Sequence, residues 1–296
     1  MLCVSQRGGP GETSPAYTTL PISPVITLAG VSKHFQSTAA LHNVSATIPP
    51  GQFVAIIGRS GAGKTTLLHC LSRTTTVTAG SIRFGTCDLA SLHGEMLRQH
   101  RARMGMIYQQ FNLVKRLHVC DNVLVGRLSH LSGVAWWLAL GRYFPAAQRD
   151  IALRCLEHVG LRHRAWQRTD TLSGGEQQRV AIAKVLAQQP QVILADEPVA
   201  SLDVMNGALV LDTLRRVASE TGLTVITTLH HVEYARRYAD RVLGLRAGEL
   251  VFDGPPSALT HTALHRLFST SLPLCALPEP AVAHSVARGG SWVESL

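Results

Sequence analysis

A glycine-rich segment that follows a short apolar run constrains the fold of this chain more than any other feature. The run FVAIIG (Phe53–Gly58) is typical of a buried strand that stops at glycine, and KTTLLHCLSR (Lys64–Arg73) is typical of a helix. The segment that joins them, GRSGAGKT, satisfies the pattern G-x-x-x-x-G-K-[ST]. A strand, a glycine-rich turn and a helix in this order predict a phosphate-binding loop.

The residue types in this loop suit a triphosphate. Glycines let the backbone wrap around a phosphate, and successive N–H groups and the helix dipole face the anion. We expect Lys64 to reach the β- and γ-phosphates and the Thr65 hydroxyl to bind Mg²⁺. A glycine turn without a ligand is the weaker interpretation, because a strand and a helix flank the motif. The predicted nucleotide contacts here are Gly58, Arg59, Ser60, Gly61, Ala62, Gly63, Lys64, Thr65 and Thr66.

Two adjacent acids follow a second apolar run. VILADEPVASLD (Val192–Asp203) places Asp196 at the end of a predicted strand, with Glu197 next to it. A carboxylate there can hold Mg²⁺, and its neighbour can polarise an attacking water. Two acids after a strand are often only the start of a loop, but parallel strands bring their carboxyl ends to one edge of a sheet. We therefore predict a metal ligand at Asp196 and a catalytic residue at Glu197.

Short β-branched runs alternate with helical patterns along the middle of the chain, which is typical of an α/β domain with parallel strands. The stretch from Leu89 to about Arg168 breaks this rhythm and predicts an inserted, mostly helical subdomain over about 89–170. Both ends of the chain are irregular in composition. We expect a disordered extension over 1–24, a nucleotide-binding domain over 25–270 and an irregular tail over 271–296.

Composition narrows the class of protein but not its partner. The chain has 296 residues, six cysteines and a formal net charge of +9. This charge suits a nucleotide, a nucleic acid or the cytoplasmic face of a membrane, but arginines scattered over a solvated surface explain it more simply. The cysteines lack metal-type spacing and predict reduced thiols of a cytosolic protein. The apolar stretch LSGVAWWLAL is shorter than the ~20 residues of a membrane span.

A second potential anion site begins at Leu172. LSGGEQQRV places a serine and two glycines at the start of a predicted helix, where backbone N–H groups can hold an anion. Together with the phosphate loop and the two acids, this motif resembles the ATP-binding subunit of an ABC transporter, over about Val25 to Phe268. The resemblance implies a P-loop NTPase core with a mostly parallel sheet, an N-terminal antiparallel β region and an inserted helical subdomain.

The resemblance also explains why one chain has two anion-binding helix starts. It implies that Ser173 and Gly175 contact the γ-phosphate of the ATP held by the opposite subunit, so that each chain contributes to two nucleotides. A helix N-cap followed by flexible glycines is the alternative interpretation of this motif in isolation.

Other positions match motifs of the family. The resemblance implies that Gln109, rather than Gln110, senses Mg²⁺ or the lytic water and links the site to the membrane partner. It implies that His230 contacts the γ-phosphate, whereas the neighbouring His231 stands where many members have an acid. Asp203 matches the loop that crosses the dimer interface.

Aromatic residues at two places leave alternatives open. Phe35 matches the residue that stacks on adenine, although a lone phenylalanine after a strand is more often part of a core. Trp136, Trp137, Tyr143 and Phe144 lie in the insert where the family docks the permease. They form part of that docking surface, or they pack the small core of the insert.

Several stretches, including IYQQFNLVKRL and TLHHVEYARRYADRV, resemble phosphonate importers in particular. The resemblance implies an ATPase with ATP and Mg²⁺ as cofactors that drives import of phosphonate or a related phosphorus oxyanion. It implies three partners: a second copy of the chain, integral membrane permease subunits and an external solute-binding protein. The protein would lie peripherally at the cytoplasmic face of the cell membrane.

Two other functions are compatible with the same motifs. One is ATP-driven transport of another cargo, such as methionine or a lipoprotein. The other is a soluble ABC-type ATPase that acts on nucleic acid, but such proteins usually carry two fused nucleotide domains or a long coiled coil. Neither is evident in this sequence, so we expect no nucleic-acid partner.

Overall fold

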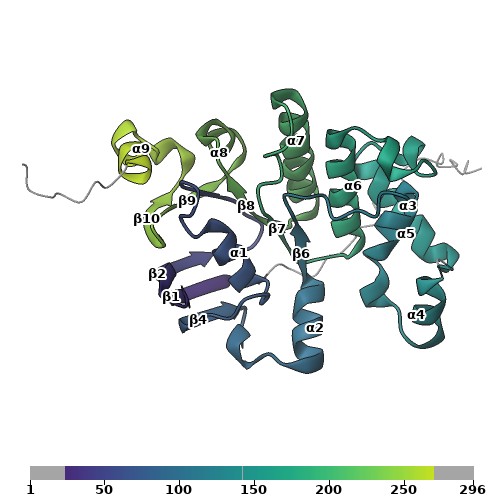
Figure 1. The fold of residues 1–296 in the computed structure, drawn as a ribbon, viewed down its shortest axis with the longest axis horizontal. Coiled ribbons are helices and arrows are strands. Elements are labelled where there is room, and N and C mark those ends of the chain that lie inside the picture. Colours follow the sequence, from purple (N-terminus) through teal and green to yellow (C-terminus); the bar gives the residue numbers. More distant parts are fainter. Residues whose placement is uncertain (1–23, 142, 270–296) are drawn as a thin grey trace, which may run out of the picture.

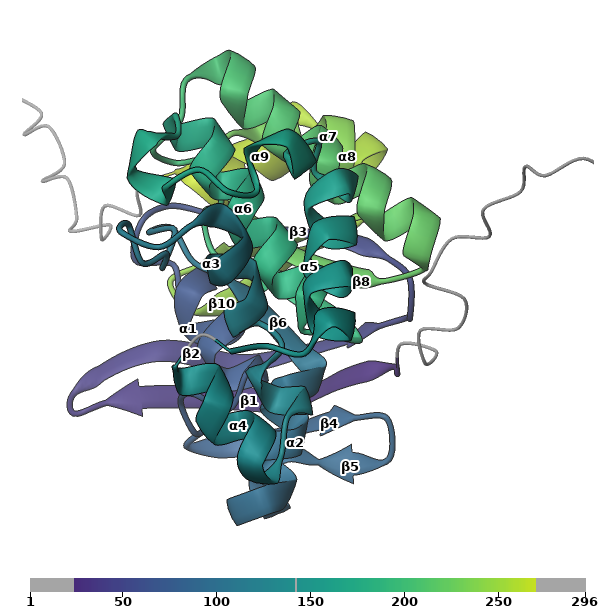
Figure 2. The same cartoon turned by 90° about the vertical axis from the view of Figure 1, so that its right-hand side faces the viewer.

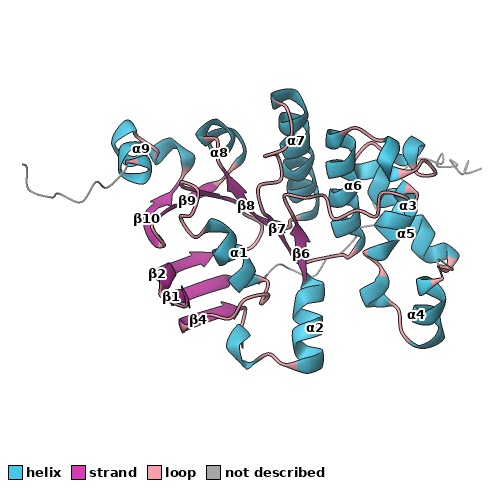
Figure 3. Ribbon diagram, in the orientation of Figure 1, coloured by secondary structure: helices cyan, strands magenta, loops and turns pink. Residues whose placement is uncertain are grey.

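Two sheets with a helix between them form the frame of the structure (Figures 1 and 3). The computed structural model describes residues 24–141 and 143–269. The predicted disordered extension and irregular tail therefore lie almost entirely outside the described residues.

The smaller sheet is antiparallel, with strand order β2-β1-β4-β5. Ile26, Leu28 and Val31 of β1 are buried between this sheet and the rest of the protein. This sheet is the antiparallel region expected near the N-terminus. Its strands are β1 (Ile26–Phe35), β2 (Thr38–Ile48), β4 (Ala79–Phe84) and β5 (Cys87–Asp88).

The larger sheet has the order β10-β9-β3-β8-β7-β6, and in the part of the chain that the structure describes only β10 pairs in the antiparallel sense. Strands β3, β7 and β8 are buried along their whole length, as expected for parallel strands covered on both faces. The strands are β3 (Phe53–Ile57), β6 (Met104–Ile107), β7 (Val192–Ala195), β8 (Thr224–Leu229), β9 (Arg241–Arg246) and β10 (Glu249–Gly254).

Helices cover the parallel sheet. Helix α1 (Lys64–Leu71) lies between the two sheets, where its Leu67 and Leu68 pack with Val54 and Ile56 of β3 (Figure 1). The other helices are α2 (Gly94–Arg103), α3 (Val119–Val125), α4 (Gly133–Leu140), α5 (Ala146–His158), α6 (Gly174–Ala187), α7 (Val204–Thr221), α8 (Val232–Tyr238) and α9 (His261–Phe268). Within the described residues, none of these helices combines the length and apolar character that a bilayer span requires.

The register of the parallel strands brings the carboxyl ends of four of them to one edge. Ile57 of β3 pairs with Leu229 of β8, and Ala195 of β7 pairs with both Thr227 of β8 and Ile107 of β6. Segments that are distant in the sequence therefore leave the sheet side by side. The residues that directly follow these four strands are Gly58, His230, Asp196 and Tyr108.

One strand of this sheet lies inside the range predicted as a helical subdomain. The sequence predicts a mostly helical subdomain over about 89–170; because β6 pairs with β7, Met104–Ile107 belong to the parallel sheet instead, and the helical region with α3, α4 and α5 begins after Ile107. Strand β6 has four residues and follows α2 directly, so its strand pattern is too short to stand out from the neighbouring helical pattern.

Candidate nucleotide-binding site

The phosphate loop connects β3 to α1 and holds a buried lysine. Lys64 is 4% exposed, and its Nζ donates hydrogen bonds to the carbonyl oxygens of Gly58 and Arg59, both at 3.0 Å. Burial lowers the pKa of Lys64 below its usual value, whereas the negative charges of Glu197 and Asp196 act in the opposite direction. The ammonium group is thus held inside the loop, within electrostatic reach of the two predicted site acids.

Gly63 shows why this loop needs glycine. It precedes α1 with a φ of 96°, in the left-handed region. A Cβ atom here would lie 2.4 Å from the carbonyl oxygen of Ala40 and 2.9 Å from Cδ2 of Leu41. The positive φ and the close approach of β2 both exclude a side chain. The antiparallel sheet therefore packs directly against the phosphate loop.

The predicted metal ligands Thr65 and Asp196 contact each other. Thr65 Oγ1 donates a hydrogen bond to Asp196 Oδ1 at 2.9 Å. Asp196 is 9% exposed, and its main-chain N–H donates to the carbonyl oxygen of Ile107 in β6 at 2.8 Å. A hydroxyl and a carboxylate are oxygen ligands of the kind that Mg²⁺ prefers, so this pair fits the predicted ion.

Gln109 lies in the loop after β6, two residues beyond Ile107. Because Ile107 is bonded to the main chain of Asp196, this loop leaves the sheet beside the acids. Gln109 and Gln110 are both exposed, so burial does not distinguish them. The choice of Gln109 stays a prediction.

Glu197 and His230 are in close contact, and His230 Nε2 lies 2.5 Å from Glu197 Oε1. Glu197 has a φ of 48°, which is uncommon for a residue with a side chain and is typical of functional sites. His231, in contrast, lies edge-on to Tyr234, with ring centroids 5.7 Å apart. The geometry favours His230 over His231 as the histidine that faces the acids.

A threonine that the sequence did not single out connects the two acids. Thr228 of β8 is fully buried; its Oγ1 donates to Asp196 Oδ1 at 2.9 Å and accepts the main-chain N–H of Glu197 at 2.8 Å. The sequence signal was weak, because a β-branched residue in LTVITT is simply a good strand former. Its role follows from the pairing of β8 with β7.

Thr228→Val is expected to lower ATP turnover by about tenfold, because loss of one hydrogen bond that orients a buried group costs about 1–3 kcal/mol. Turnover and thermal unfolding should be measured together. The matched control is Thr227→Val, which removes an equally buried hydroxyl whose 3.5 Å contact is with the Thr228 carbonyl. Wild-type turnover in Thr228→Val would mean that this hydroxyl does not position the acids.

Ser173 caps helix α6. Its Oγ accepts the N–H of Glu176 at 3.3 Å, and the Glu176 carboxylate accepts the N–H of Ser173 at 2.9 Å, which completes a capping box. The N-cap interpretation is therefore confirmed as local structure. It is compatible with phosphate binding, because a hydroxyl that accepts one hydrogen bond can still donate its own proton. Contact with a nucleotide on a second copy stays a prediction.

Gly175 is buried against the start of α7. A Cβ atom at Gly175 would lie 2.7 Å from Oδ1 of Asn206. Asn206 in turn donates from Nδ2 to Asp203 Oδ2 at 2.6 Å, and Asp203 is the N-cap of α7. The glycine thus permits two helix starts to pack closely, rather than supplying flexibility, and it joins Asp203 to the serine–glycine segment.

Phe35 ends β1 and is 48% exposed, so its interpretation as a core residue is wrong. Lys33 Nζ lies 4.9 Å from the ring centroid. The ring belongs to the same β1–β2 hairpin that contacts the phosphate loop through Ala40. Its position is compatible with stacking on a base, which stays a prediction.

Similarity to known proteins decides the family. A family model described as ABC transporter matches residues 41–200, more than half of the chain. The chain belongs to the ABC transporter family. Two curated relatives, the phosphonates import ATP-binding proteins PhnC of Bradyrhizobium diazoefficiens and Rhizobium meliloti, are each 47% identical to it. The first alignment covers 82% of this chain and 90% of the relative, and the second covers 81% and 85%.

Solved structures of ABC transporter proteins share the fold. A dimeric structure of MJ0796, a bacterial ABC transporter cassette, has a TM-score of 0.68 and 32% identity, and the match covers 78% of this chain and 98% of that one. CbiO1 from Clostridium perfringens has a TM-score of 0.71 and 24% identity, and the match covers 82% of this chain and 94% of that one. At this identity the match supports the fold alone. The resemblance and the fold class predicted from the sequence are therefore confirmed.

Proposed function

We propose that this chain is the ATP-hydrolysing subunit of an ABC importer that takes up phosphonate or a related phosphorus oxyanion through a separate permease. One observation carries the ATPase: the phosphate loop, the acid pair Asp196–Glu197 and His230 meet at a single edge of the parallel sheet. The cargo is supported by the two relatives that are 47% identical and are named phosphonates import ATP-binding proteins.

The geometry suits hydrolysis of a terminal phosphate. Lys64 and the N–H groups of the loop would hold the β- and γ-phosphates. Glu197 would accept a proton from the attacking water, and His230, in contact with Glu197, would orient that carboxylate beside the γ-phosphate. These groups are preorganised, since Glu197 and His230 already contact each other and Lys64 is already held by two carbonyl oxygens of the loop.

Magnesium fits the same edge. Thr65, Asp196 and Gln109 would bind the ion, and when bound it would neutralise phosphate charge. Within 24–141 and 143–269, no three His, Cys, Asp or Glu side chains form a metal site by themselves. This donor set fits an ion that takes its other ligands from phosphate and water.

Two copies of the chain would complete each site. The capped start of α6, with Ser173 and Gly175, would contact the nucleotide held by the phosphate loop of the other copy. A ligand shared in this way stabilises the pair, and hydrolysis weakens it. Self-pairing suits a chain that carries both halves of the site.

The proposed import also requires a permease and an external solute-binding protein, with this subunit peripheral at the cytoplasmic face of the membrane. We propose that the nucleotide-binding domain spans 25–270 and that its helical part after β6 docks the permease. Phe144 is 9% exposed and packs in the core, which leaves Trp137 and Tyr143, each 70% exposed, on the surface.

Growth on an alkylphosphonate as the sole phosphorus source tests the cargo. Deletion of the gene is expected to abolish this growth but not growth on inorganic phosphate, and the wild-type gene should restore it. Restored growth with a Lys64→Ala gene would contradict the ATPase assignment. If the deletion impaired methionine uptake instead, the assignment of phosphonate as the cargo would be wrong. Tight, salt-dependent binding of nucleic acid by the protein, without a membrane partner, would contradict the proposed importer function.

A further inference from the structure

Helix α4, with the sequence GVAWWLAL, has no charged side chain, yet much of it is exposed. Val134 is 73%, Trp137 70% and Leu138 51% exposed, and Tyr143 just after the helix is 70% exposed. Trp136 lies edge-on to Trp137, with ring centroids 5.1 Å apart, so the two rings stay together at the surface. An apolar cluster of this kind usually marks an interaction site.

Positive charge is concentrated in the sequence segment that contains this helix. From Gly94 to Arg149, which includes all of α2, the sequence contains eight lysines and arginines and two acids, Glu95 and Asp121. This segment is less than a fifth of the chain but carries most of the formal net charge of +9. It includes α2, whose sequence GEMLRQHRAR has three arginines, of which Arg98 is ion-paired with Glu95 of the same helix. The net positive charge is thus concentrated in one segment rather than scattered evenly along the sequence.

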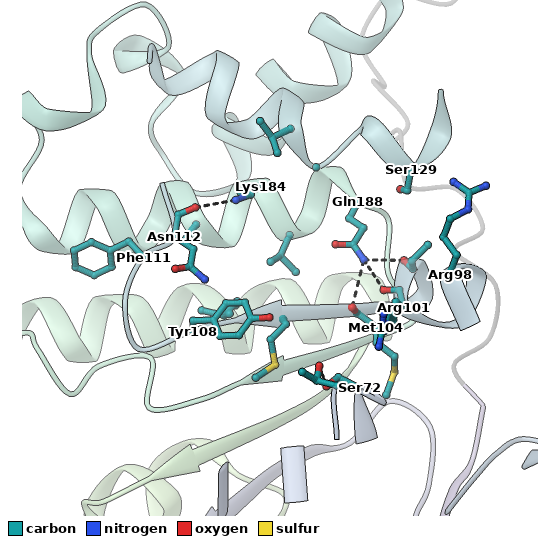
Figure 4. Close-up of a pocket in the computed structure, with 18 residues that line it drawn as sticks. Ser72, Arg98, Arg101, Met104, Tyr108, Phe111, Asn112, Ser129, Lys184 and Gln188 are labelled. Carbon is teal, nitrogen blue, oxygen red and sulfur yellow. Dashed lines mark hydrogen bonds between the residues drawn. The ribbon is translucent and has the colours of Figure 1, made fainter. Parts of the chain in front are cut away.

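Helices α2 and α4 lie at the same end of the molecule in both views (Figures 1 and 2). A cavity of about 420 Å³ lies between α2, α6 and the segment before α4 (Figure 4). Arg98 of α2 and Ser129, which precedes α4, lie near each other in that view. Gln188 Nε2 donates to the Arg101 and Ala102 carbonyl oxygens at 3.0 and 2.9 Å, which fixes α2 on the end of α6.

We propose that this end of the molecule, formed by α2, α4 and Tyr143 and here called the α2–α4 surface, contacts the anionic headgroups of a lipid bilayer. Tryptophan and tyrosine favour the membrane–water interface, and arginines attract anionic lipids. Helix α4 is too short to span a bilayer, so it lies along the headgroup region with its apolar side chains toward the acyl boundary.

The helical part after β6 is proposed to dock the permease, but for α4 within it a lipid surface accounts for the pattern better than a segment of the permease does. Helix α4 offers no charged group for a specific ion pair, and the arginines lie apart from it on α2. An extended anionic surface can meet both helices at once. The lipid proposal depends on the proposed importer function in one respect: an importer subunit that works with a permease lies close to a membrane.

Vesicle binding by the purified full-length protein, without its permease, tests the proposal. We expect co-sedimentation with vesicles of phosphatidylcholine mixed with phosphatidylglycerol, weakening as salt is raised, and little with pure phosphatidylcholine. The double variant Trp136→Ser/Trp137→Ser and the double variant Arg98→Gln/Arg101→Gln should each reduce binding about tenfold. Equal binding of the wild type to both vesicle types would overturn the proposal.

Matched controls remove the same groups elsewhere. Trp166→Ser deletes a ring that is 63% exposed outside the α2–α4 surface, and Arg83→Gln/Arg266→Gln removes two exposed charges from β4 and α9. Both controls should bind vesicles like the wild type; equal losses in controls and test variants would also overturn the proposal.

Two further measurements separate this proposal from the proposed function. All these variants should hydrolyse ATP in solution at the wild-type rate, because none lies in the nucleotide site. Capture by detergent-solubilised permease should also be unchanged in the tryptophan variant. If that capture fails while the wild type ignores vesicles, α4 docks protein and the lipid proposal is wrong, whereas the ATPase assignment stands.

Discussion

Glu197→Gln is expected to stop ATP hydrolysis while holding two copies of the chain together. The amide oxygen can still contact His230, but it cannot take a proton from water, so turnover should fall by about 10²–10⁴-fold. Binding through the phosphate loop is retained because Lys64 and the loop backbone are unchanged. Size-exclusion chromatography with Mg-ATP should therefore show a dimer, and without nucleotide a monomer.

The matched control for this variant is Glu220→Gln, which neutralises an exposed acid near the end of α7. It should hydrolyse ATP normally and dissociate after turnover. Hydrolysis that survives Glu197→Gln would contradict the assigned base. A variant that stays monomeric with Mg-ATP would contradict the two-copy site.

Lys64→Ala is expected to lower both nucleotide affinity and turnover by about 100-fold. Charge-assisted hydrogen bonds to phosphate are among the strongest that a side chain makes, and removing one preorganised donor costs about 10²–10³ in rate. Titration with a fluorescent ATP analogue measures the first effect, and steady-state phosphate release measures the second. The exposed Lys115 provides the control variant Lys115→Ala, which should leave both quantities unchanged.

The thermal unfolding of the Lys64 variants must be measured as well. The lysine is buried, so its removal also frees the carbonyl oxygens of Gly58 and Arg59 and leaves a cavity. Lys64→Met keeps most of the volume, and it should lose activity as fully as Lys64→Ala but less stability. Substantial turnover in a folded Lys64→Met protein would mean that the ammonium group does not hold the phosphates.

The edge that forms the site could be predicted from the sequence because each motif ends a strongly apolar strand. FVAII and VILA are buried along their whole length, and such runs favour parallel strands covered on both faces. These two strands flank β8 in the parallel sheet, so the residues after them meet at one edge. The contact of Thr65 with Asp196 is therefore a direct consequence of local patterns.

The features that could not be predicted from the sequence depend on packing between segments that are distant in the chain. Strand β6 is too short for its pattern to differ from that of the helix before it. Thr228 has its role only because β8 lies beside β7, and Gly175 is needed only because Asn206 of α7 packs on it. Local residue patterns do not specify these neighbours.

The way in which Lys64 is held affects the thermodynamics of nucleotide capture. A lysine side chain that becomes immobilised loses about 2 kcal/mol of rotamer entropy. Here two main-chain carbonyl oxygens already restrain the amine, so this loss occurs when the chain folds rather than when ATP arrives. In the proposed complex with ATP, more of the attraction between ammonium and phosphate would then be expressed as affinity. Capture would be an exchange of hydrogen-bond acceptors around a stationary donor.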